Sequence, residues 1–311
     1  MSANNLTAVT GKEKSKSYAA QKRTALIASY VFLIVLSIIW VIPIIWVVLT
    51  SFRAEPGQFS PTFFPRPFTG DDGNVHFENA VFTLKNYKDL FTPREGFDFA
   101  KMWMNTFIVA TISCVISTFF AVATSYVMSR LRFKLRRTFM NIALVMGMFP
   151  GFMSMIAIYF ILKSVGIHQT LAALVLVYSA SSGLGFYVCK GFFDTVPKAL
   201  DEAAMIDGAN KAQVFFKIIL PMSKPIIVYQ ALNAFMGPWM DFIFAKFLMG
   251  QHYDTYTVAI GLFSMLDKEH IDIYFRQFAA GSVLVAVPIM ALFMSLQKYY
   301  VEGVTGGAVK G

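Results

Sequence analysis

Residues 24–52 read TALIASYVFLIVLSIIWVIPIIWVVLTSF and carry no charged side chain between Arg23 and Arg53. An α-helix needs about 20 apolar residues to cross a bilayer, so this stretch predicts a membrane-spanning helix. It is too long for a removable signal peptide and lacks the small residues of a cleavage site. We therefore expect a retained helix at the start of a membrane protein.

The composition of the whole chain also indicates a membrane protein. Of its 311 residues, 56% are hydrophobic and 14% are charged, whereas soluble domains have roughly 25% charged residues. An ionised side chain at the bilayer centre costs roughly 2.5–3.5 kcal/mol, so long uncharged runs mark the spans. The predicted spans are residues 25–50, 102–129, 138–162, 170–189, 225–249 and 277–297. The expected fold class is an all-α membrane protein with six transmembrane helices.

The distribution of Lys and Arg predicts the orientation of these spans. With residues 1–24 and the tail 301–311 placed in the cytosol, 17 of the 27 basic residues lie on the cytosolic side, as the positive-inside rule requires. The basic turn from Arg130 to Arg137 is then a connection that can touch anionic lipid headgroups. This interpretation accounts for the net charge of +9 without a nucleic-acid partner.

Three connections are longer than a turn needs. The extracytosolic connection 51–100 is rich in proline and predicts an irregular loop with one short helix near Leu84 to Leu90. A second extracytosolic connection covers residues 250–275. The third, residues 191–224, is expected in the cytosol.

The cytosolic connection 191–224 predicts two short amphipathic helices. Asp194 or Thr195 can cap the first helix, and Gly208 suits a left-handed stop at its end. The second helix is expected to run from Lys211 and to end at Pro221, because proline lacks the amide that a continuing helix needs. Small alanines bind lipid weakly, so helices of this kind are better suited to a protein partner than to the membrane surface.

The spacing of residues in this connection resembles the EAA loop of binding-protein-dependent ABC importer permeases. The matching residues are Glu202, Ala203, Ala204, Gly208, Ile218, Leu220 and Pro221. The resemblance implies a type I ABC importer permease fold, in which this loop is the coupling helix that docks into a cleft of a cytosolic ATPase. The expected ATPase-docking residues are Glu202, Ala203, Ala204, Asp207, Gly208, Ile218, Leu220 and Pro221.

The side chains of this loop suggest individual roles. Ala203 and Ala204 would keep the helix thin enough to enter a cleft, and Glu202 could pair with a basic group of the ATPase. Gly208 would permit the tight turn between the two helices.

The resemblance extends over nearly the whole chain and is closest to permeases of the MalG type, which serve maltose, maltodextrin and related carbohydrates. Trp239-Met240-Asp241-Phe242 resembles the Trp-Asn-Asp/Glu-Phe element of sugar permeases and departs from it at Met240. The glycine-rich end resembles the tail that reaches the ATPase interface, although composition alone favours a disordered end. The candidate tail residues are Thr305, Gly306, Gly307, Val309 and Lys310.

In MalG-type subunits, the loop before the last span reaches toward the sugar cleft of the binding protein. The corresponding candidates here are Asp267, Lys268, Glu269 and His270. Their residue types follow no strict motif, so a solvated loop is the alternative for each side chain.

The function implied is that of a permease subunit, forming half of a sugar pore in a bacterial cytoplasmic membrane. Its expected partners are a MalF-like second permease, two copies of an ABC ATPase and an extracytosolic sugar-binding protein. Maltose or maltodextrin is the favoured cargo. The alternatives are another oligosaccharide or glycerol phosphate as cargo, or a different class of protein, an ion-coupled secondary transporter.

The chain has no GxxxxGK[ST] loop and its four histidines are scattered, so we expect no catalytic residue, metal or cofactor on it. ATP and Mg would be used by the partner ATPase.

Two features within the spans leave alternatives open. Asp241 is the acidic residue within a span, and such a group either lines a translocation path or forms a hydrogen-bonded structural contact. The run from Gly147 to Gly151 contains Pro150, so it is either a helix-packing surface or a bending point.

Overall fold

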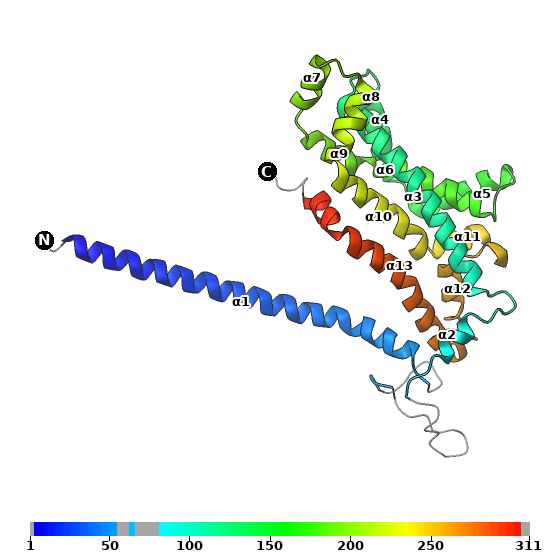
Figure 1. Cartoon of the computed structure of the whole chain (residues 1–311). Helices are drawn as coiled ribbons and strands as arrows, with labels where there is room; N and C mark the ends of the chain where they lie inside the picture. The colour runs from blue at the N-terminus through cyan, green and yellow to red at the C-terminus, as the bar shows by residue number, and fades with distance from the viewer. Residues whose placement is uncertain (1–2, 55–61, 66–80, 306–311) are drawn as a thin grey trace.

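The computed structural model describes residues 3–54, 62–65 and 81–305 and confirms the all-α prediction (Figure 1). Its long helices are α1 (Ala3–Ser51), α3 (Phe99–Arg130), α6 (Leu171–Thr195) and α13 (Ile271–Thr305). Among the described residues, the segments of α1, α3 and α13 are each long and apolar enough to cross a membrane. The number of candidate spans rises to six if each of three bent helix pairs forms one span.

The segment predicted as a single span at 138–162 consists of two helices. α4 (Arg136–Gly147) and α5 (Gly151–Ser164) meet at an angle of 101°. Pro150 lies at the break in an extended conformation, with φ −60° and ψ 126°. Because proline has no amide hydrogen to continue the α4 ladder, it fits the position directly before a new helix. The run from Gly147 to Gly151 is thus a bending point.

A row of small buried side chains lets α3 pack closely against α6. The row repeats every four residues and consists of Ser113, Ser117, Ala121, Ser125 and Ser129. In a membrane, small residues at this spacing allow helix backbones to approach each other. The Ser125 hydroxyl donates a hydrogen bond to the Phe186 carbonyl of α6 at 2.8 Å. The pair α3 and α6 therefore forms the most closely packed part of the bundle.

The other long helices do not all contact this pair. α10 (Lys224–Met240) packs against both α3 and α13. α1 meets α13 near one end, where the rings of Trp46 and Phe275 lie 5.9 Å apart, and then diverges from the bundle (Figure 1). None of its most apolar window is buried, so lipid or another membrane helix must cover it.

Short helices close the two ends of the bundle. One end carries α2 (Lys85–Leu90), α11 (Ile243–Met249), the 3-10 turn η2 (Tyr253–Thr255) and α12 (Val258–Ser264). α2 confirms the short helix predicted there. The opposite end carries α7 (Ala199–Ile206), α8 (Lys211–Gln213), the π-helix η1 (Val214–Ile219) and α9 (Leu220–Met222) (Figure 1).

Candidate functional site

α7 ends in a tight reversal at Gly208, as predicted. Gly208 has φ +87°, its amide donates to the Met205 carbonyl, and the Ala209 amide donates to the Ala204 carbonyl. This pair of hydrogen bonds is a Schellman stop, which favours glycine at the left-handed position. A Cβ added at Gly208 would meet nothing within 4 Å, so only the backbone conformation restricts this position.

The start of α7 and the end of the following helix differ from the prediction. Neither Asp194 nor Thr195 caps α7, because α6 continues through both residues. The second helix does not end at Pro221 but continues to Met222. The wide π-turn of η1 comes directly before Pro221, which occupies the first turn of α9, where a missing amide costs no hydrogen bond.

α7 presents an exposed surface on one side and packs against its own chain on the other. Glu202, Ala203 and Asp207 are exposed, and so is Ile206, with 86% of its surface accessible. Ala204 is instead buried against the bundle. Its small side chain therefore lets α7 pack closely against the rest of the chain. We had expected Ala204 to keep the exposed side of α7 thin, and its burial contradicts that expectation.

The cluster beneath α7 joins four helices of the bundle. It contains Val122 and Tyr126 of α3, Phe193 of α6, Ala204 of α7 and Ile226 of α10. The predicted docking residues Ile218 and Leu220 pack against the same cluster, while Pro221 is exposed. The structure thus brings the predicted residues together, but divides them between an exposed surface and a core.

Arg130, at the end of α3, holds this arrangement together. Its guanidinium donates to the carbonyls of Phe193 at 3.0 Å and Val196 at 2.8 Å, and lies 3.4 Å from the Asp201 carboxylate. Only 3% of the Arg130 side chain and 15% of the Asp201 side chain are exposed. One side chain therefore connects α3, the end of α6 and the first turn of α7.

A second polar contact supports the same junction. The Ser129 hydroxyl donates to the Asp194 carboxylate at 2.6 Å, and Lys190 forms an ion pair with the other carboxylate oxygen of Asp194 at 2.5 Å. Asp194 thus ties α6 to α3, which explains why it does not cap α7. The predicted contact of this basic turn with lipid headgroups does not hold for Arg130, because its side chain is buried. Arg132 and Lys134 of the same turn are exposed.

We expect Arg130→Gln to release α7 from the bundle. Removing one partner of a buried ion pair costs about 3–5 kcal/mol, so amide hydrogens of α7 should exchange roughly a hundredfold faster or more. Hydrogen–deuterium exchange with mass spectrometry measures this effect, with Arg132→Gln in the same turn as the matched control. Equal exchange in the two variants would contradict the anchoring role of Arg130.

Asp241 lies at the break between α10 and α11. One carboxylate oxygen accepts a hydrogen bond from the Phe244 amide at 3.0 Å, and the other accepts one from the Tyr178 hydroxyl of α6 at 2.7 Å. The same residue lines a cavity of about 410 Å³ together with residues of α5, α6 and α11, including Gly151 and Ile158. The geometry therefore gives Asp241 a structural contact and a place at a cavity wall.

Asp241→Ala should lower the stability of the protein by roughly 2 kcal/mol, because each lost hydrogen bond contributes about 1 kcal/mol. Asp241→Asn retains an acceptor oxygen and should lose less than half of that amount. Thermal unfolding of the purified protein measures both, with Glu269→Ala in an exposed turn as the control. Identical unfolding temperatures for all three variants would show that the contacts of Asp241 do not stabilise the fold.

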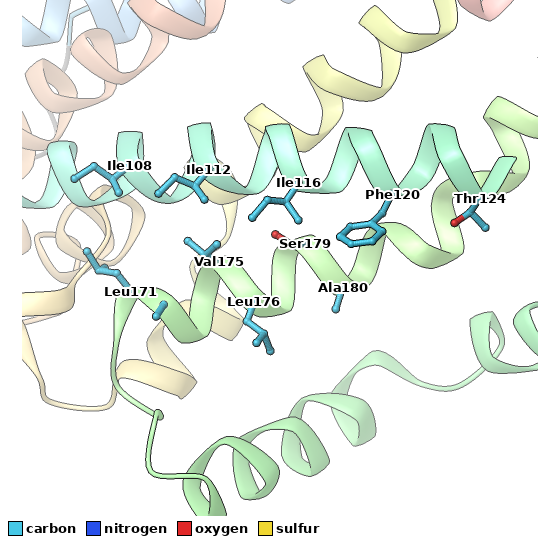
Figure 2. Close-up of a pocket in the computed structure, with 11 residues that line it drawn as sticks. Ile108, Ile112, Ile116, Phe120, Thr124, Leu171, Val175, Leu176, Ser179 and Ala180 are labelled. Atoms are coloured by element: carbon cyan, nitrogen blue, oxygen red, sulfur yellow. The ribbon is translucent and has the colours of Figure 1, made fainter. Parts of the chain in front are cut away.

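An apolar cavity of about 850 Å³ lies between α3 and α6. Figure 2 shows Ile108, Ile112 and Ile116 of α3 facing Val175 of α6 across it. Thr124 and Ser179 are its hydroxyl-bearing residues, so a polar solute would find few hydrogen-bond partners here. The lining suits an apolar occupant.

The other predicted residues are placed as follows. Asp267, Lys268, Glu269 and His270 lie exposed in the turn between α12 and α13. Thr305 is the last residue of α13, and Gly306, Gly307, Val309 and Lys310 lie outside the described residues. Within the described part of the chain, no group of three or more His, Cys, Asp or Glu residues could hold a metal ion.

Comparisons with known proteins give relatives along nearly the whole chain. The chain is 31% identical over 287 residues to the galactooligosaccharides transport system permease protein GanQ of Bacillus subtilis (strain 168), covering 92% of this chain and 96% of GanQ. It is 30% identical over 303 residues to the maltodextrin transport system permease protein MalD of Streptococcus pneumoniae (strain ATCC BAA-255 / R6), covering 96% and 100% of the two chains.

The fold has a counterpart among solved structures. A bacterial ABC transporter involved in the import of the acidic polysaccharide alginate matches with a TM-score of 0.70 at 18% identity, over 89% of this chain and 97% of the matched chain. Residues 115–306 match the family model described as binding-protein-dependent transport system inner membrane component. The chain belongs to this family, the membrane-embedded permease subunits of ABC importers.

Proposed function

We propose that this chain forms half of the translocation pore of an ABC importer for oligosaccharides, with maltodextrin as the preferred cargo. Support for a sugar comes from relatives named for galactooligosaccharide and maltodextrin transport. In this proposal the second half of the pore is a MalF-like permease, and the complex resides in a bacterial cytoplasmic membrane. Two ATPase copies bind ATP and Mg, while this chain binds no cofactor.

The observation that carries the proposal is the attachment of α7 to the bundle. Its outer surface exposes Met205 and Ile206, whose apolar side chains are accessible by 47% and 86%. Exposed apolar side chains that lie together are typical of a protein-docking surface, and Glu202 beside them can pair with a basic group of the partner. We assign this surface to the ATPase.

Movement of the ATPase would then reach the pore through rigid contacts. Arg130 connects α7 directly to α3 and α6, and the buried cluster around Ala204 extends the contact to α10. A displacement of α7 would therefore move these three helices together, because a packed core transmits strain. This is the coupling that alternating access requires.

Asp241 is our candidate for the translocation path. It borders the cavity of about 410 Å³ at the junction of α5, α6 and α11, next to the bend between α4 and α5 and the break between α10 and α11. Broken helices at membrane depth commonly line a polar route, because unwound backbone needs a polar surrounding. The tail from Thr305 onward and the loop 267–270 are assigned to the ATPase interface and the binding protein, respectively.

Gly208→Val should uncouple ATP hydrolysis from transport without unfolding the protein. The left-handed backbone of Gly208 is strongly unfavourable for a β-branched residue, so the turn that positions α7 will shift. Sugar uptake into proteoliposomes and ATP hydrolysis are measured on the same samples, and we expect uptake per ATP to fall roughly tenfold. Ala212→Val, an exposed helical site in α8, is the control. Full coupled transport by Gly208→Val would contradict the proposal.

The cargo is tested on the assembled complex. We would purify the tagged chain with its associated subunits, add candidate binding proteins, and measure ATP hydrolysis with maltodextrins, galactooligosaccharides, other oligosaccharides and glycerol phosphate. Stimulation by maltodextrins is the expected result. Stimulation by another sugar would retain the importer and change only its cargo. Uptake driven by an ion gradient, with no ATPase in the complex, would overturn the proposal.

A further inference from the structure

A polar cavity of about 480 Å³ opens at the end of the bundle opposite α7. Its lining comes from the turn before α3, from α11 and the segment that follows it, from the end of α12, and from the turn and first residues that begin α13. The lining residues are Arg94, Glu95, Gly96, Phe97, Lys246, Tyr253, Tyr256, Ser264, Asp267, His270 and Tyr274. Its volume lies within the range of small-molecule sites, roughly 300–1,000 Å³.

Two cations line the cavity, each beside a tyrosine side chain. The Arg94 guanidinium lies 4.4 Å from the centre of the Tyr274 ring, and the Lys246 ammonium donates a hydrogen bond to the Tyr256 hydroxyl at 2.5 Å. Arg94 also donates to the Gln277 side chain and to the Asp89 carbonyl. Among the described residues, neither cation forms an ion pair with a carboxylate.

The mouth of the cavity carries acceptors and an exposed ring. Glu95, Asp267 and His270 are exposed, and Tyr253 has 53% of its surface accessible. The Tyr253 ring lies against the backbone of Gly96, where an added Cβ would come within 3.1 Å of it. Glycine at this position therefore lets the aromatic ring form one wall.

The walls are held in place before any ligand arrives. Asn105 of α3 donates to the carbonyls of Asp254 and Tyr256, both at 3.0 Å. Lys101 pairs with Asp254 and lowers the pKa of its carboxyl through that hydrogen bond. The Tyr256 hydroxyl donates to the Gly250 carbonyl at 2.8 Å. Preorganised walls reduce the ordering cost of binding.

This combination selects a class of ligand. A free anion would be repelled by Glu95 and Asp267, and a free cation by Arg94 and Lys246, while an acyl chain would leave all four groups unsolvated. A sugar ring carries hydroxyls that both donate and accept, and its C–H faces stack on aromatic rings. Cationic donors, carboxylate acceptors and an exposed tyrosine match those requirements together.

We propose that this cavity is a sugar-binding site at the extracytosolic mouth of the pore, holding one or two rings of an oligosaccharide. The assignment rests on the proposed function, in which sugar arrives from a binding protein on this side. Asp267 and His270 would thus contact the sugar itself, in addition to any contact of their turn with the binding protein.

The test measures sugar binding by the purified complex in nanodiscs, without binding protein and without ATP. Saturation-transfer NMR with maltotriose, and with galactobiose in parallel, detects weak binding. We expect Tyr253→Ala and Asp267→Asn to lower the transferred saturation roughly fivefold, as loss of one aromatic or charge-assisted contact predicts. Tyr253→Phe should retain it, because the ring remains. Asp272→Asn, a matched charge change on the exposed first turn of α13, should equal wild type.

The outcomes separate this site from the proposed function. Wild-type saturation in both Tyr253→Ala and Asp267→Asn, or no saturation in wild type, would overturn the sugar site. Variants that bind sugar normally, but whose ATP hydrolysis is no longer stimulated by the sugar-loaded binding protein, would also overturn the sugar site. In that case the cavity would be a contact site for the binding protein. Stimulated ATP hydrolysis on the same samples tests the proposed function separately, and it can persist when the sugar site fails.

Discussion

The buried guanidinium of Arg130 is the interaction on which the rest of the structure depends. A charge with 3% of its side chain exposed needs several partners, and it finds two carbonyls and one carboxylate. Those partners belong to α6, the segment after it and α7. The cost of burying the charge is thereby offset only when all of these elements are in place, which makes the junction a single unit.

Close helix packing makes that junction possible. The small residues from Ser113 to Ser129 bring α3 against α6, so Arg130 at the end of α3 reaches the carbonyls at the end of α6. The π-turn of η1 and the break at Ser223 then turn the chain back into α10. Farther from α7, the breaks at Pro150 and Asp241 lie beside one largely apolar cavity, in whose wall Asp241 is the ionisable residue. Rigid contacts thus hold the inner side of α7, and interrupted helices border the cavity beside Asp241.

Much of this architecture follows from the sequence. Uncharged runs predicted an all-α membrane protein, and Asp207-Gly208 predicted the stop of α7. The burial of Arg130 could not be predicted, because the positive-inside rule already accounted for every basic residue in its turn. The hydrogen-bond pattern of Asp194 and the continuation through Pro221 depend on tertiary contacts and a π-turn, which no local pattern specifies. The sugar cavity joins segments far apart in the chain.

The central claim is that α7 and α3 move as one body. Double electron–electron resonance measures this directly, with spin labels at Ala199→Cys, exposed at the start of α7, and Lys134→Cys, in the turn after α3, and with Cys114 and Cys189 replaced by Ser. In the assembled complex, the distance distribution should be unchanged between the nucleotide-free state and the ATP-trapped state. A shift of several ångströms between the two states would show that α7 moves independently of α3 and would contradict the account.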